Sequence, residues 1–307
     1  MGKKTKGFFL PTISEKFFNC FNVIIMVCIG FITFYPFWFC LVLSLNEGAD
    51  AVRGGPIFLW PRVFTLDNYS FIATNPKVLG AAFVSVSRTI LGVLLHLALT
   101  GIVSYGLSKK YVIGRKIYLT IFILTMYFSG GLIPYYLTLR NLGLLDNFLI
   151  YIVPTMFSFY NCILMMVYYE SIPVELEEAA TIDGAGYLKV FAAIIIPTSL
   201  PIYATIALFA GVGQWNAWFD TLIYTKSTNL VTLQVIVRNL INQAEAVREM
   251  NEQMAAAGAT AAEGLANISP ITIRVSTMVF TILPISFVYP FLQRFFVKGI
   301  LLGSVKG

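Results

Sequence analysis

Long apolar runs, separated by polar segments of very different length, set the pattern of this chain. Uncharged stretches of about 19 residues or more, the length that crosses roughly 30 Å of hydrocarbon as a helix, occur six times. They cover residues 21–45, 89–107, 117–139, 147–169, 201–219 and 275–293, and apolar sequence around Arg88 extends the second to 78–107. Because lipid offers no partner for backbone N–H and C=O groups, and the runs are too long for alternating barrel strands, they should be helices. The pattern predicts an all-α membrane protein with six transmembrane helices.

Composition supports the same class. The 307 residues are 58% hydrophobic and only 12% charged, whereas a soluble domain is roughly half apolar and a quarter charged. The single histidine, His96, has no acidic or histidine neighbour on its predicted helix, and the cysteine spacings fit no zinc site. We therefore expect no metal site, and no basic arm is long enough to indicate nucleic-acid binding.

The basic residues indicate an orientation. An even number of spans places both termini on one side, and Lys and Arg concentrate in the N-terminal segment 1–20, the loop 108–116 and the tail 294–307, which share that side. We expect both termini in the cytoplasm. The first run exceeds a usual signal-peptide core and no small-residue cleavage site follows it, so it should be a retained span.

Two long polar segments lie outside in this topology. The first, 46–77, is rich in Gly and Pro, and the second, 220–269, includes a stretch of helix-forming composition at 244–257. Loops of such length are usually either functional or disordered. For the second we favour contact with a partner protein over an unstructured connection.

The inner segment 170–200 concentrates negative charge in the stretch ELEEAATIDGA. Its sequence predicts two short helices. Ser171 suits the N-cap of the first, whose dipole favours the acids, and Gly184 permits a sharp turn. The second should run from Tyr187 until Pro197 interrupts it. Such a unit can serve as a rigid contact for a soluble protein, and the alternative is a solvated acidic loop.

This loop also carries a recognisable motif. From Glu178 it reads E-A-A, then three residues, Gly184, nine residues, and I-x-I-P ending at Pro197. The order resembles the EAA signature of ABC importer permeases, E-A-A-x3-G-x9-I-x-L-P, and Ile196 in place of Leu is the only departure.

Further stretches narrow the resemblance. EEAATIDGA from Glu177 is similar to the carbohydrate-uptake, maltose-type branch of the family. MYFSGGLIPYYL from Met126, WNAWFD from Trp215 and YPFLQRFFVKGILLGSVKG from Tyr289 resemble its LplC/YtcP-like subfamily, which is associated with aldouronates and other complex oligosaccharides.

The resemblance implies a type I ABC importer permease fold with a cytoplasmic EAA coupling-helix loop. It implies a second homologous permease that completes a heterodimer, a pair of cytoplasmic ATPase subunits that bind ATP and Mg, and an extracellular binding protein that delivers an oligosaccharide. All would act at a bacterial cytoplasmic membrane by alternating access. The ATPase-coupling residues would be Glu177, Glu178, Ala179, Ala180, Asp183, Gly184 and Pro197. The chain contains no G-x4-G-K-[ST] phosphate loop, so we expect it to hydrolyse no ATP and to hold no cofactor.

A sugar pathway needs aromatic faces and uncharged hydrogen-bonding groups. Both kinds occur at the end of the fifth span and in the third. The candidate pathway residues are Tyr127, Tyr135, Gln214, Trp215, Asn216 and Asp220. The alternatives are an aromatic belt at the headgroups and amides that bridge helices.

Two local features accompany these candidates. Gly130-Gly131, followed by Pro134, indicates close helix packing or a break in the third span. Arg88 and Arg274 either pair with Asp220 or extend to the interface, and we favour pairing.

Two other classes fit less well. An ion-coupled secondary transporter or channel needs ionisable groups inside the membrane, yet the uncharged runs hold only His96. An intramembrane enzyme would need a zinc cluster or a G-x-S-x-G elbow, and neither motif occurs.

Overall fold

The computed structural model describes residues 13–53, 59–243 and 269–303. Within these ranges there is no β-strand, only an isolated bridge between Asn46 and Phe64, so the predicted all-α class is confirmed. The segment 1–12, the predicted helix at 244–257 and the end of the tail lie outside the described residues.

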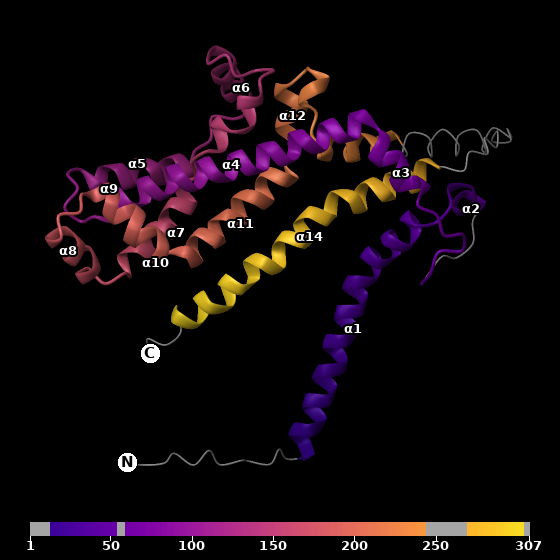
Figure 1. Cartoon of the computed structure of the whole chain (residues 1–307), viewed down its shortest axis with the longest axis horizontal. Helices are drawn as coiled ribbons and strands as arrows, with labels where there is room; N and C mark the ends of the chain where they lie inside the picture. The colour runs from indigo at the N-terminus through magenta and orange to yellow at the C-terminus, as the bar shows by residue number, and fades with distance from the viewer. Residues whose placement is uncertain (1–12, 54–58, 244–268, 304–307) are drawn as a thin grey trace. The chain divides into compact units, whose positions relative to one another are not determined.

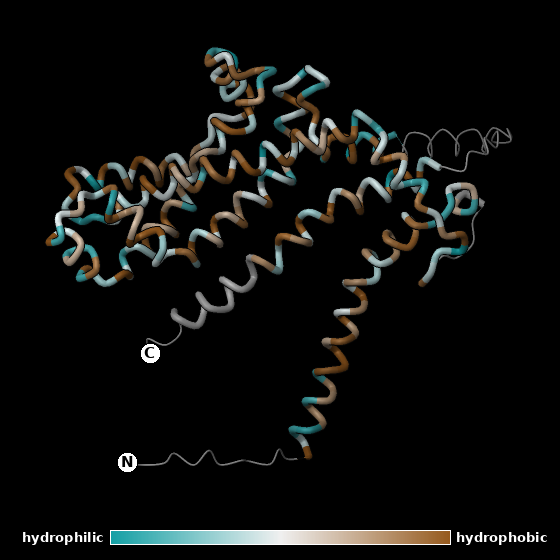
Figure 2. Tube along the Cα trace, viewed as in Figure 1, coloured by the Kyte–Doolittle hydropathy of each residue, from teal (hydrophilic) through white to brown (hydrophobic). Residues whose placement is uncertain are grey.

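Three of the described helices are long and apolar enough to span a membrane: α1 (Ile13–Ser44), α4 (Pro76–Ser108) and α14 (Pro270–Gly303). Three bent pairs pass the same test when each counts as one span: α5 (Arg115–Tyr127) with α6 (Leu132–Asn141), Phe148–Thr155 with α7 (Phe159–Glu170), and Tyr187–Thr198 with α11 (Leu200–Asn216). Hydrophobic residues dominate these elements (Figure 2). Up to six spans follow from length and composition, consistent with the predicted number.

The third span is broken where the glycines predicted a break. Between α5 and α6 the chain turns by 118°, and Gly131 has φ of 81°, a conformation that costs other residues steric strain. The span predicted as one helix over 117–139 is therefore two helices at a steep angle.

The fourth span also differs from a single helix. It starts as two short 3-10 turns, η1 (Phe148–Tyr151) and η2 (Val153–Thr155), and continues as α7 after a bend of 47°. The side chain of Asn147 accepts a hydrogen bond from the N–H of Leu149 and begins the first turn, and Pro154 starts the second.

The coupling loop forms two helices, as predicted, but with different boundaries. Ser171 does not cap the first helix. It ends α7, and its Oγ donates to the carbonyl of Tyr168 at 2.6 Å. The first helix, α8 (Glu175–Ile182), has Val174 at its N-cap.

Pro197 does not interrupt the second helix. The helical run passes from α9 (Tyr187–Val190) through a π-helical segment, η3 (Phe191–Ile195), into α10 (Ile196–Thr198). The wider π turn absorbs the missing N–H and the bulk of the proline ring. The break comes at Ser199, before α11, at an angle of 82°.

The chain divides into two units, 1–71 with 261–279 and 72–260 with 280–307. In the first unit, parts of the segment predicted as a loop after α1 are helical. It contains α2 (Gly48–Arg53) and begins α3 (Asp67–Thr74). The buried Asn68 donates to the carbonyls of Ser44 and Asn46, each at 3.0 Å, which holds the end of α1 against this segment.

In the second unit, α4 packs along α7 and α11 (Figure 1). The core nearest α8 consists of Tyr105, Met165, Tyr169, Phe191, Ile195 and Ile206. α6 and α12 (Phe219–Tyr224) project from the same side of α4 (Figure 1). After α12 come a short 3-10 turn, η4 (Thr228–Leu230), and a helical stretch over 233–243.

Candidate functional site

The end of α8 is a tight turn at Gly184. Gly184 has φ of 79°, and its N–H and that of Ala185 donate to the carbonyls of Thr181 and Ala180. This pair of hydrogen bonds is the Schellman arrangement, in which a left-handed glycine reverses the chain after a helix. This turn leads the chain from α8 into α9 without a long flexible loop between the two helices.

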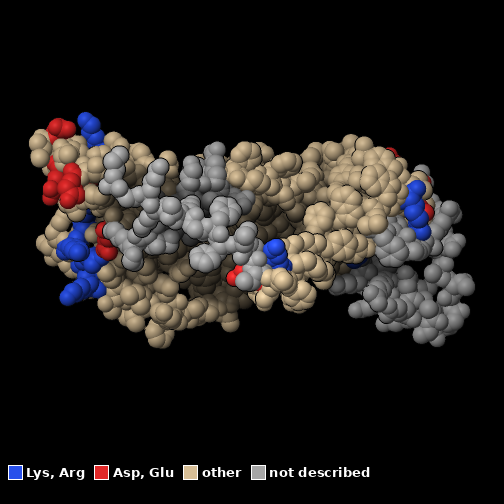
Figure 3. All heavy atoms as spheres, turned by 90° about the horizontal axis from the view of Figure 1, so that it is seen from below, with Lys and Arg blue, Asp and Glu red and all other residues tan. Residues whose placement is uncertain are grey.

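One face of α8 is open. Glu178, Ala179, Asp183 and Gly184 are exposed. The apolar Ile182 is 86% exposed beside them, in a segment otherwise dominated by charge. Figure 3 shows acidic and basic side chains gathered at the end of the molecule that carries α8. Tyr187 and Leu188, at the start of α9, are also exposed, and exposed apolar residues grouped among polar ones are typical of a surface that a partner protein covers.

The opposite face of α8 turns inward. Glu177 and Ala180, three residues apart on the helix, are only partly exposed. Glu177 binds Lys109 Nζ through both carboxylate oxygens, at 2.5 and 2.6 Å, and accepts a hydrogen bond from the Tyr105 hydroxyl at 3.2 Å. Among the predicted coupling residues, Glu177 thus contacts α4 of its own chain. Pro197 lies farther along, in α10.

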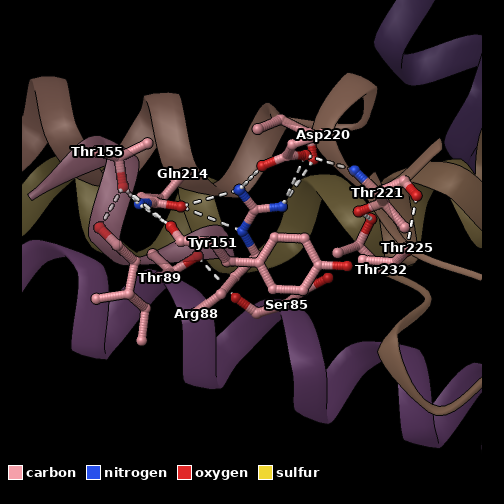
Figure 4. Close-up of polar contacts among 12 residues, drawn as sticks. Ser85, Arg88, Thr89, Tyr151, Thr155, Gln214, Asp220, Thr221, Thr225 and Thr232 are labelled. Atoms are coloured by element: carbon pink, nitrogen blue, oxygen red, sulfur yellow. Dashed lines mark hydrogen bonds and ion pairs between the residues drawn. The ribbon is translucent and has the colours of Figure 1, made fainter. Parts of the chain in front are cut away.

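A second polar cluster surrounds Arg88, in the N-terminal half of α4 (Figure 4). The guanidinium is buried, with its side chain 1% exposed, and it binds Asp220 through Nη2 at 2.5 Å and Nη1 at 3.2 Å. Nε and Nη2 also donate to Gln214 Oε1 at 3.1 and 3.0 Å, and the ring of Tyr151 lies 4.3 Å from the guanidinium carbon. The predicted pairing of Arg88 with Asp220 is confirmed.

The other predicted arginine behaves differently. Among the described residues Arg274 forms no ion pair, and its buried Nε makes no hydrogen bond. Arg274 and Asp220 belong to different units, so the pairing expected between them stays a prediction.

Gln214 extends the cluster to the fourth span. Its Nε2 donates to the carbonyl of Tyr151 at 2.9 Å and to Thr155 Oγ1 at 2.5 Å. The carbonyl of Thr155 lies 2.9 Å from His96 Nδ1, and Asn161 Nδ2 lies 2.8 Å from His96 Nε2. Because a carbonyl only accepts, the contact with Thr155 is a hydrogen bond donated by His96 Nδ1. The imidazole is structural, and the described residues contain no metal-binding cluster.

A cavity of about 180 Å³ lies beside this cluster, with Arg88, Gly92, His96, Thr155, Gln214 and Asp220 in its wall. At about 30 Å³ per molecule, this volume holds roughly six water molecules. In this conformation the hydrogen bonds of Arg88 and Gln214 join α4, the fourth span and α11.

The remaining pathway candidates are dispersed. Trp215 is buried and donates to the carbonyl of Thr281 at 3.1 Å. Asn216 is exposed, and its Oδ1 lies 3.5 Å from Gln234 Nε2. Tyr127 is 79% exposed at the end of α5. The six candidates are thus not brought together in one site.

Tyr135 lines a separate groove. It is 44% exposed, and its ring meets that of Tyr224 edge-on with centroids 6.0 Å apart. The groove holds about 530 Å³ at the break between α5 and α6, where Gly130 and Gly131 leave the backbone uncovered. Ser129 and Thr138 add hydroxyls to its wall.

Several residues that contact these two clusters could not be identified from the sequence. Tyr151 contributes a backbone carbonyl, and Thr155 one hydroxyl among many. Lys109 is different, since it lies in a short basic loop on the same predicted side of the membrane as the acidic segment, and charge complementarity between the two indicates the contact.

Comparison with known proteins agrees with this architecture. No protein-family model matches the chain. It is 35% identical over 298 residues to Protein LplC of Bacillus subtilis, covering 96% of this chain and 97% of that protein. It is 34% identical over 258 residues to the polygalacturonan/rhamnogalacturonan transport system permease protein YtcP of the same organism, covering 84% of this chain and 87% of YtcP.

A solved structure is similar over nearly the whole fold. The crystal structure of a bacterial ABC transporter involved in the import of the acidic polysaccharide alginate matches with a TM-score of 0.81 and 29% identity, covering 94% of this chain and 99% of that one. The resemblance carried by the EAA motif is confirmed. The chain belongs to the sugar-transporting ABC importer permeases, in the subfamily of LplC and YtcP.

Proposed function

We propose that this chain is the permease subunit of an ATP-driven importer that takes up a complex oligosaccharide. The observation that carries the proposal is the open face of α8, where Glu178, Ala179 and Gly184 lie exposed beside Ile182. In an otherwise apolar chain, this face offers acceptors, small side chains and an apolar residue to a soluble partner. The similarity to YtcP, a polygalacturonan/rhamnogalacturonan permease, and to the alginate importer supports a polysaccharide-derived substrate.

The partners follow from this role. A pair of cytoplasmic ATPase subunits would dock on α8 and supply the energy, with ATP and Mg bound in those subunits and no cofactor in this chain. A second homologous permease would form the other half of a heterodimer, and an extracellular binding protein would deliver the sugar. α8 and both termini would face the cytoplasm, in keeping with the basic residues on that side.

For the sugar pathway we propose the groove of Tyr135 and Tyr224. An aromatic face packs against the C–H surface of a sugar ring, and neighbouring hydroxyls and bare backbone at Gly130 satisfy sugar hydroxyls. Tyr127 and Asn216 are exposed and remain candidates along the route, whereas Gln214, Trp215 and Asp220 would shape the pathway from behind.

The test is affinity purification of the tagged chain in mild detergent, with identification of co-purifying proteins and an ATPase assay. We expect a second permease and an ATPase subunit. Gly184→Trp should abolish ATPase recovery and sugar uptake while membrane insertion persists, because bulk at the turn blocks close approach.

Gly184→Ala is the matched control. It imposes the same strain at positive φ, yet its Cβ would meet no atom within 4 Å. Loss of the ATPase with Trp but not with Ala supports docking at this surface. Full uptake by the Trp variant, or recovery of the wild-type chain alone with no ATPase, would contradict the proposal.

A further inference from the structure

The contact between α8 and α4 is a feature that the docking surface alone does not explain. We infer that Lys109 and Tyr105 are positioning residues that fasten the coupling helix to α4 through Glu177, so that movement of the ATPase displaces α4 directly. The inference rests on the proposed function, and it concerns the inward face of α8 rather than the face that would meet the ATPase.

The three side chains form a closed set, here called the Glu177 triad (Tyr105, Lys109 and Glu177). Lys109 Nζ binds both carboxylate oxygens and also lies 4.5 Å from the centroid of the Tyr105 ring. The Tyr105 hydroxyl donates to the same carboxylate. The side chains of Lys109 and Glu177 are 18% and 19% exposed, so water and salt screen this ion pair less than one on an open surface.

Tyr105 also packs against the second half of the coupling loop. Its ring lies 5.1 Å, centroid to centroid, from that of Phe191 in the π segment. On the adjoining loop, burial and the neighbouring Tyr187 side chain, at the start of α9, raise the pKa of the Tyr111 phenol. α4 and the residues that follow it therefore hold both α8 and the helical run after α9.

The connections along the chain explain why these contacts are needed. The coupling loop lies between α7 and α11 in the sequence, so these two helices must move with it. α4 is not adjacent to the loop in sequence and meets it only through side-chain contacts. α4 is one unbroken helix from Pro76 to Ser108. The distance along it from Lys109 to Arg88 is roughly 32 Å at 1.5 Å per residue. Movement imposed at the triad thus reaches the Arg88 cluster, which ties α4 to α11 and α12.

The experiment uses the complete transporter, purified with its ATPase and second permease and reconstituted in vesicles with an oligosaccharide. Sugar transported and ATP hydrolysed are measured together for Lys109→Met, Lys109→Arg and Tyr105→Phe. We expect Lys109→Met to assemble normally but to transport roughly fivefold less sugar per ATP, the factor that about 1 kcal/mol represents. Lys109→Arg should restore the ratio, because it restores the charge.

Lys110→Met is the matched control. Lys110 is the neighbouring lysine on the same loop, is exposed, and forms no ion pair within the part of the chain that the structure describes. Equal ratios for Lys109→Met and Lys110→Met would overturn the inference. If Lys109→Met fails to assemble, the double variant Lys109→Glu with Glu177→Lys, which exchanges the two charges, is compared with Lys109→Glu alone. More sugar transported per ATP by the double variant supports the triad, and no increase refutes it. A wild-type chain that neither binds an ATPase nor transports would instead refute the proposed function.

Discussion

Gly92 lies directly against the side chain of Gln214. A Cβ at this position would stand 2.6 Å from Gln214 Nε2 and 2.9 Å from its Cδ. The missing side chain lets α4 and α11 approach closely enough for the Gln214 amide to reach both Arg88 and the carbonyl of Tyr151. The absence of a side chain at Gly92 therefore allows the polar cluster to form, although Gly92 contributes no polar group of its own.

Gly92→Ala should destabilise the chain by about 1–3 kcal/mol, because Gln214 must move away from its hydrogen-bond partners. Thermal unfolding of the purified protein in detergent measures the effect. Gly106→Ala, on the same helix, would meet no atom within 4 Å, and it should leave stability unchanged or raise it by up to about 1 kcal/mol through helix propensity. Equal melting temperatures for the two variants would contradict this role for Gly92.

Arg88→Met should also destabilise, since it leaves the Asp220 carboxylate without its counter-ion. Breaking a buried ion pair costs about 3–5 kcal/mol, and the 18% exposure of Asp220 places the expected loss toward the lower value. A double-mutant cycle with Asp220→Asn isolates the pair. We expect the double variant to lose clearly less stability than the two single losses together, and simple additivity would show that the residues act independently.

Parts of this architecture could be predicted from sequence for definite reasons. A membrane penalises an isolated charge, so Arg88 and Asp220 were expected to pair, and they do. Gly130 and Gly131 indicate the break between α5 and α6, and at Gly131 the φ of 81° is a conformation that other residues rarely adopt. Gly184 was placed at the turn after α8 on the same argument.

Other parts depend on packing between distant segments. Tyr151 accepts the hydrogen bond from Gln214 through its backbone carbonyl. Every residue carries such a carbonyl, so no sequence pattern predicts this contact. The π segment before Pro197 likewise arises from the proline together with the packing of Phe191 on Tyr105. The inward direction of Glu177 follows only once Lys109 is known to lie opposite.

Asp146 should make stability depend on pH in the acid range. Its carboxylate accepts hydrogen bonds from the Ser227 hydroxyl and from the backbone N–H groups of Ser227 and Lys226, and these lower the pKa of Asp146 below its ordinary value. A lowered folded-state pKa means that the stabilisation is complete above the ordinary value of about 3.9 and is lost as the pH falls through the folded-state value.

Asp146→Asn is the matched variant, because Asn keeps the shape and tolerates the φ of 55° at this position. The wild-type protein should melt at a higher temperature than this variant above about pH 5, and the difference should close as the pH falls below about 4. A difference that stays constant over this range would show that the charge of Asp146 contributes nothing.

Tyr135 allows the proposed sugar route to be tested separately from the ATPase contacts. Tyr135→Ala should raise the apparent KM for uptake roughly fivefold, the effect of losing about 1 kcal/mol of ring contact, while Tyr135→Trp keeps an aromatic face and should retain uptake. Tyr118→Ala is the control, since Tyr118 is half exposed on α5 and does not line the groove. ATPase assembly should be normal in all three variants. If Tyr135→Ala and Tyr118→Ala transport alike, the groove lies off the sugar route.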